Sequence, residues 1–169
     1  MLCLSHLAWV LWYLGYPEQG LLRGHEAMVL AQEVEHPYSL AMARIYLAVL
    51  HYLRREDARV QQLTEAALAL ANAHDYPHWR MMSHVLHGWA LIMLGQPEAG
   101  LTELQEGLAA RKAVGTSTSP FSYFLLDEVY AAVGQAEAGL GALAETQAMV
   151  QHLNEHWVEP EFTASRENC

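Results

Sequence analysis

One short phrase recurs along the chain and constrains the fold more than any other feature. It joins the end of an apolar run, through a glycine, to a proline, a glutamate and small residues that open the next run. The copies are residues 14–21 (LGYPEQGL), 94–101 (LGQPEAGL), 133–140 (VGQAEAGL) and, without glycines, 53–60 (LRREDARV). The copies at 14–21 and 94–101 are typical of one helix ending at glycine and another beginning at proline. The copy at 133–140 keeps the turn glycine but has alanine in place of the proline. The chain is therefore predicted to be a helical repeat.

Two sets of residues that mark turns between helices recur with the same period of about 40 residues. The turn position within the phrase is taken by Gly15, Arg54, Gly95 and Gly134, and the opposite turn by Pro37, Pro77 and Pro120. Such a period fits a helix-turn-helix unit. We expect an all-α, right-handed superhelical solenoid of about four repeats, formed by residues 1–157, followed by an irregular tail at 158–169. The expected helices are 2–14, 17–34, 38–53, 57–73, 78–94, 97–114, 121–133 and 137–153.

Small residues recur at fixed places in these helices. They are Ala8 and Gly88 in the first helix of a pair, and Gly20, Gly100, Gly139, Ala27, Ala66 and Gly107 in the second. A glycine inside a helix costs roughly 0.5–1 kcal/mol relative to alanine. Its repetition at one register position predicts close helix approach.

The pattern resembles the tetratricopeptide repeat, in which small residues let the two helices of a pair pack closely. The longer period, the LGxPExGL turn and the run from Leu70 to Pro77 (LAxxxxxP) are similar to the C-terminal solenoid of bacterial signalling proteins. Those proteins join an AAA-type ATPase to repeats, often with a class III adenylyl/guanylyl cyclase or a regulator's DNA-binding domain. The resemblance implies a scaffold role only, because no phosphate-binding loop occurs here and Lys112 is the only lysine.

Composition excludes several classes of partner. The formal net charge is −10, with 9 Lys and Arg against 19 Asp and Glu. An acidic chain is a poor ligand for nucleic acid or for an anionic membrane. Only Cys3 and Cys169 are cysteines, and no basic region precedes the first apolar run, so we expect a cytoplasmic protein.

No catalytic or metal-binding signature stands out. His84 and His87, and also His152 and His156, have helical spacing, but no HExxH motif or cysteine pair accompanies them. We expect the first pair to line the seam between two packed helices and the second to lie near a helix end. No serine lies in a GxSxG motif. We therefore expect no enzyme activity, no cofactor and no metal.

A protein or peptide partner fits the sequence better. The first helices of tetratricopeptide repeats line the concave face, and the same register here predicts an aromatic groove. Its expected residues are Trp9, Trp12, Tyr13, Arg44, His51, Tyr52, Met82, Trp89, Met93, Phe124 and Glu128. Whether Trp12, Met93 and Phe124 are core instead stays open. The main alternative is that this groove closes over a small apolar effector, and a third is a part of a cyclase or ATPase whose catalytic domains are encoded elsewhere.

The two ends of the array carry no polar cap. A helix begins abruptly at Leu2, and Pro160 interrupts the opening of a fifth pair. Repeat arrays need polar-faced terminal repeats to stay soluble. We expect a fragment of a longer array, with Leu4, Leu11, Val150 and Leu153 exposed and a homodimer formed through the terminal repeats.

Overall fold

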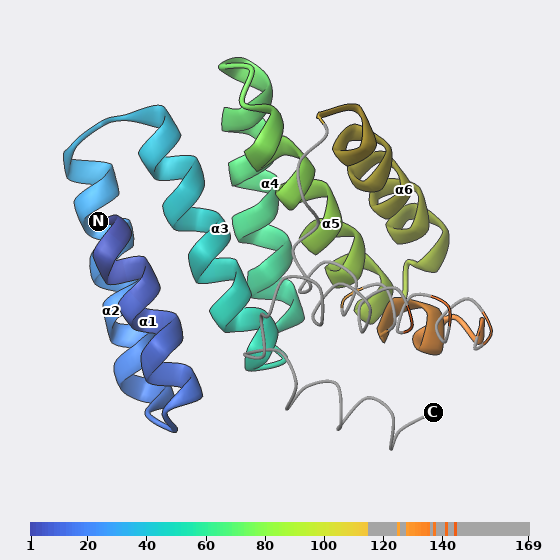
Figure 1. The fold of residues 1–169 in the computed structure, drawn as a ribbon, viewed down its shortest axis with the longest axis horizontal. Helices are drawn as coiled ribbons and strands as arrows, with labels where there is room; N and C mark the ends of the chain where they lie inside the picture. The colour runs from blue at the N-terminus through green and yellow to red at the C-terminus, as the bar shows by residue number, and fades with distance from the viewer. Residues whose placement is uncertain (115–124, 126–127, 136, 138–140, 142–143, 145–169) are drawn as a thin grey trace.

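The computed structural model of the chain describes residues 1–114, 125, 128–135, 137, 141 and 144. Six antiparallel helices follow one another: α1 (Leu2–Tyr13), α2 (Pro17–Glu33), α3 (Pro37–Leu53), α4 (Asp57–Ala73), α5 (Pro77–Met93) and α6 (Pro97–Val114) (Figure 1). The described residues contain no strand. The prediction of an all-α helical-repeat solenoid is confirmed. Both ends of each of the six helices lie within one residue of the predicted bounds. Pro120 and most of the fourth pair lie outside the described residues.

Helices α1 to α5 each end in the same kind of turn. A residue with positive φ stands at positions 15, 35, 55, 75 and 95, which are 20 residues apart, and a further one at Gly134. In most of these turns the next N–H donates to a carbonyl five residues back, as from Tyr16 to Leu11 at 2.8 Å. This is the Schellman pattern that closes a helix C-terminus. Arg55, with φ of 59°, is therefore the counterpart of Gly15, and the predicted alignment on Arg54 is wrong by one residue.

Small residues bring paired helices into backbone contact, as predicted. A Cβ added to Gly20 would lie 2.7 Å from the carbonyl oxygen of Ala8. At Gly100 it would lie 2.5 Å from the carbonyl oxygen of Gly88. No side chain fits there, so the glycines fix how closely α1 packs on α2, and α5 on α6.

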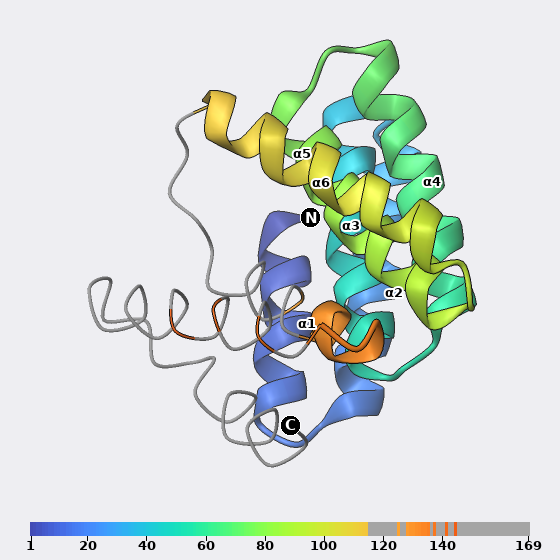
Figure 2. The ribbon, with the colours of Figure 1, turned by 90° about the vertical axis from the view of Figure 1, so that its right-hand side faces the viewer.

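The helices form two rows. Besides the contacts between consecutive helices, α1 contacts α3 and α3 contacts α5. These three first helices make the inner row, while α2 and α4 lie on the opposite side (Figure 2). The core is centred on α3 and α5, where Ile45, Tyr52, Leu86 and Trp89 are buried. Leu125 and Val129 belong to the same core.

Candidate functional site

A strip of aromatic rings crosses the inner row from α1 to α5. Trp9 stacks on Tyr46 with ring centroids 4.4 Å apart, and Tyr46 meets Trp79 edge-on at 6.4 Å. Tyr38 continues the strip, 5.6 Å from Trp79 and 5.1 Å from Tyr76. We call these five residues the aromatic strip.

The strip is rigid and partly open to solvent. The indole Nε1 of Trp9 donates to the carbonyl of Tyr46 at 3.1 Å, and the Tyr46 hydroxyl lies 3.2 Å from Nε2 of His6. Burial, together with nearby Tyr38, raises the pKa of Tyr46, so its hydroxyl stays neutral. Tyr38 is 42% exposed. The strip therefore offers apolar ring faces with positions fixed in advance.

Several groove residues predicted from the sequence lie along or beside α1 and α5. Trp9 is part of the strip, and Tyr13 is exposed near the end of α1. Trp12 is half-buried against the cluster of Ala8, Leu47 and Leu50. Met82 and Met93 are half-buried against the main core, and Phe124 lies outside the described residues.

The predicted shared surface of Arg44, His51, Tyr52 and Trp89 is wrong. Tyr52 and Trp89 are 1% and 0% exposed and pack edge-on with ring centroids 4.7 Å apart. The Tyr52 hydroxyl donates to a carboxylate oxygen of Glu128 at 2.9 Å, and Arg55 pairs with the same carboxylate. Packing against Leu125 and Val129 places these rings in the core rather than in a groove.

Arg44 also has a structural partner. Its guanidinium donates to the carbonyl of Ala66 on α4 at 2.8 Å, and burial lowers its pKa. The side chain therefore faces the neighbouring helix of its own repeat. For this reason Arg44→Glu is expected to destabilise the fold.

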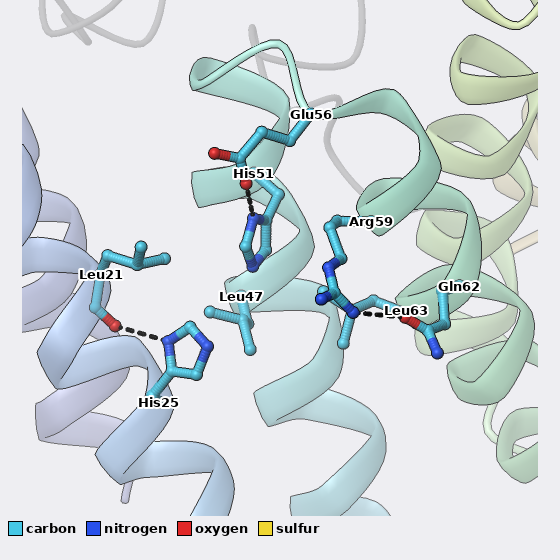
Figure 3. Close-up of a pocket in the computed structure, with 8 residues that line it drawn as sticks. All are labelled: Leu21, His25, Leu47, His51, Glu56, Arg59, Gln62 and Leu63. Atoms are coloured by element: carbon cyan, nitrogen blue, oxygen red, sulfur yellow. Dashed lines mark hydrogen bonds and ion pairs between the residues drawn. The ribbon is translucent and has the colours of Figure 1, made fainter.

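His51 lies in a hollow on the side of the inner row that faces α2 and α4. The hollow, of about 340 Å³, is bounded by α2, α3 and α4 (Figure 3). Its lining consists of Leu21, His25, Leu47, His51, Glu56, Arg59, Gln62 and Leu63. His51 projects from α3 into this space, with His25 of α2 on one side and Arg59 of α4 on the other (Figure 3).

Hydrogen bonds fix the tautomers of both histidines of the hollow. Nδ1 of His51 lies 2.5 Å from a Glu56 oxygen, and Nδ1 of His25 lies 2.9 Å from the Leu21 carbonyl. Because neither oxygen can donate, both Nδ1 atoms carry a proton, and in the neutral form of each ring Nε2 is the acceptor. Burial lowers the pKa of His51, against the opposing effect of Glu56, so the ring is neutral. The Glu56 pKa is lowered mainly by its bond to Arg54.

His84 and His87 lie where they were predicted, in the seam between paired helices. Nδ1 of His84 is 2.6 Å from Glu103 of α6, and His87 is buried beside the same carboxylate. His152 and His156 lie outside the described residues.

Comparison with known proteins establishes a likeness of fold. No protein-family model matches the chain, and neither does any curated protein sequence. Among solved structures, the crystal structure of the apo form of RapI superposes with a TM-score of 0.68 at 15% identity, over 94% of this chain and 58% of RapI. RapI is a helical-repeat solenoid, so the chain is a tetratricopeptide-like helical repeat that spans little more than half of RapI's length. Among the described residues, no helix is both long and apolar enough to span a membrane.

Sequence reasoning missed most of the aromatic strip. Tyr38 follows Pro37 directly and Trp79 lies two residues after Pro77, both in the first turns of α3 and α5, and Tyr76 is the N-cap of α5. The signal was the recurrence of aromatic residues beside these prolines. His25 carried no such signal, because its proximity to His51 depends on how α2 packs against α3.

Proposed function

We propose that this protein is a non-catalytic interaction module that binds a peptide or a partner helix across the aromatic strip. The observation that carries the proposal is the strip itself, an array of rings on the inner row in which Tyr38 is exposed to solvent and Trp9 is half-buried. Aromatic side chains lose little entropy on binding and dominate the energetics of interfaces.

The charge of the chain indicates the chemistry of the partner. With a net charge of −10, the chain attracts a basic segment and repels an acidic one. Arginine and lysine also bind the faces of tyrosine and tryptophan rings. We therefore expect a segment that alternates basic and apolar side chains.

A selection from a random peptide library tests this function. Peptides selected against the wild-type protein should be enriched in Arg, Lys and apolar residues. Tyr38→Ala should lower their affinity at least tenfold, or about 1.4 kcal/mol, because it removes an exposed ring of the strip. The midpoint of thermal unfolding should hardly change.

Tyr16→Ala is the matched control, since Tyr16 is also an exposed tyrosine but lies outside the strip, in the turn before α2. It should leave peptide affinity unchanged. If both variants lose peptide affinity equally, or if neither substitution changes that affinity, the strip is not the binding surface.

The hollow supports a second function, the sensing of a small molecule. Its volume of about 340 Å³ is near the lower end for ligand pockets. The two acceptor Nε2 atoms and the guanidinium of Arg59 suit a small zwitterion that carries an amine and a carboxylate. The sequence had suggested an apolar effector, but this lining combines three leucines with five polar side chains. Ligand-induced thermal stabilisation that Arg59→Gln abolishes and Tyr38→Ala leaves intact would favour this alternative.

The wider context proposed for the module is a bacterial signalling protein of the cytoplasm. This rests on the LGxPExGL turn, which is similar to the solenoids that follow AAA-type ATPases and class III cyclases. In that setting the module would act on catalytic domains encoded outside this chain and would not bind nucleic acid. The genomic reading frame upstream of Met1 tests the proposal, because an in-frame ATPase domain would support it and an unrelated domain would oppose it.

A further inference from the structure

Five ionisable side chains from three helices meet in the seam between α5 and α6. His84 and His87 stand three residues apart on α5, opposite Glu103 and Glu106 on α6. Glu65 approaches from α4. Residues three apart on a helix share one face, so an HxxH pair here faces an ExxE pair.

The distances in this cluster suit a metal ion as well as hydrogen bonds. Oε2 of Glu103 is 2.6 Å from Nδ1 of His84 and 3.6 Å from Nδ1 of His87. Oε2 of Glu106 is 3.7 Å from Nδ1 of His84. Ligand atoms about 2.0–2.1 Å from a tetrahedral ion lie about 3.3 Å from one another. One ligand atom each from His84, Glu103 and Glu106 falls within 4.8 Å of the others, so small side-chain shifts would let these three residues hold one ion.

His87 supplies an independent reason for a ligand at this place. The residue is only 8% exposed, and both of its ring nitrogens are buried without a hydrogen-bond partner among the described residues. Carboxylate oxygens face both nitrogens, Glu103 at 3.6 Å from Nδ1 and Glu65 at 3.5 Å from Nε2. Leaving buried polar atoms unpaired is costly. A metal ion bound to Nδ1 of His87 would take the lone pair of that nitrogen. The proton on Nε2 would then point at Glu65, as metal-bound histidines usually direct their second N–H at a carboxylate.

The backbone of the third repeat explains why these side chains can meet. Gly88 and Gly100 are in direct backbone contact, and a Cβ at Gly107 would lie 3.1 Å from the Cβ of His84. The two helices are therefore close enough for short side chains to converge. Glu106 is 61% exposed and gives an ion access from solvent.

We propose that His84, His87, Glu103 and Glu106 bind one divalent transition-metal ion of the zinc type, with Glu65 holding the distal nitrogen of His87. Two imidazoles with carboxylates favour such ions over magnesium or calcium, which prefer oxygen ligands alone. The ion would join α5 to α6 and stabilise the third repeat. This site is separate from the aromatic strip and does not depend on the proposed partner.

Titration of the chelator-treated, full-length protein with Co²⁺ and with Zn²⁺ tests the site. Co²⁺ should bind at one equivalent and give the visible absorption of a tetrahedral complex, and Zn²⁺ should displace it. Saturating Zn²⁺ should raise the melting temperature, because a ligand that binds only the folded state stabilises it. Failure to reach saturation at one equivalent, or the absence of any thermal shift, would overturn the proposal.

Substitutions separate this site from adventitious binding by the other histidines. His87→Ala and Glu103→Gln should remove the Co²⁺ absorption, and Glu65→Gln should weaken affinity roughly 10–100-fold. His78→Ala and Glu98→Gln, on the same two helices but outside the cluster, should bind as the wild type does. If these control substitutions weaken Co²⁺ binding equally, the ion is held only adventitiously by side chains on the surface. If His87→Ala loses helical circular dichroism, the near-isosteric Glu103→Gln decides the outcome.

Discussion

Among the described residues, three other than glycine hold a left-handed backbone conformation at turns between helices. Glu35, Arg55 and Asp75 have φ of 50°, 59° and 50°, where Gly15 and Gly95 hold about 80° at equivalent places. An L-residue pays roughly 1–2 kcal/mol for this conformation. Arg55 and Asp75 have ion-pair partners there, Glu128 and Arg80, whereas the Glu35 side chain has no contact that offsets the strain in the described structure.

Glu35→Gly should therefore stabilise the protein. We expect the free energy of unfolding, measured with urea, to rise by about 0.5–1 kcal/mol, since glycine adopts a positive φ without steric cost. Glu33→Gly, two residues earlier and still inside α2, should lower it by a similar amount. A destabilised Glu35→Gly protein would contradict the assignment of this turn.

His51 should make stability depend on pH. Burial lowers its pKa in the folded protein below the ordinary value of 6.5, so the unfolded chain binds the proton more readily. Its contribution to the free energy of unfolding is fully present above pH 6.5 and is lost as the pH falls through the folded pKa. His51→Gln should flatten the loss of stability between pH 6.5 and pH 5. The pKa of Glu56 is lowered from 4.5, so its own effect on the free energy of unfolding appears only at a lower pH. An unchanged slope in His51→Gln would show that other groups control this range.

At the scale of helices, the sequence predicted where elements begin and end better than which faces they bury. Proline at the start and a tight turn at the end are local signals, and they located all six described helices. The side on which a ring lies is not local. Trp89 and Tyr52 were assigned to a groove because they lie on first helices, but they are buried in the same core cluster as Leu125 and Val129. The same limit applied to His25 and His51, which come together only when α2 packs on α3.

The glycine contacts between paired helices should be the least tolerant positions of the fold. Gly100→Ala would place a methyl group 2.5 Å from the carbonyl oxygen of Gly88 and from Ile92, and the backbone cannot yield easily. We expect a loss of about 1–3 kcal/mol in the free energy of unfolding. Gly141→Ala is the control, since a Cβ there would meet nothing within 4 Å. It should be neutral or stabilising, and a larger loss than at Gly100 would reverse the argument.

At the scale of the whole molecule, the first repeat exposes an apolar face on α1 and two further apolar side chains on α2. Leu2, Leu7, Val10 and Leu14 on or beside α1 are 42–65% exposed, and Leu22 and Val29 of α2 are 55% and 53% exposed. The sequence had named Leu4 and Leu11 as the exposed residues, but both are half-buried, whereas Val150 and Leu153 lie outside the described residues. The first repeat does expose apolar side chains, as expected, but not the ones that were named. Which side chains of α1 are exposed depends on how α1 is rotated about its axis when it packs against α2.

This face should drive weak self-association of the protein. Exposed apolar patches of this kind favour contact between copies, and α1 itself carries no Asp, Glu, Lys or Arg that would oppose pairing. Sedimentation velocity over a wide dilution series should show a mass that rises with concentration. Val10→Glu should shift this equilibrium toward the monomer at least tenfold, because the contact would bury a charge without a partner. Leu94→Glu places the same charge at an exposed leucine at the end of α5, away from this face, and should leave association unchanged. A wild-type protein that is monomeric at every concentration would show that the apolar face does not pair with itself.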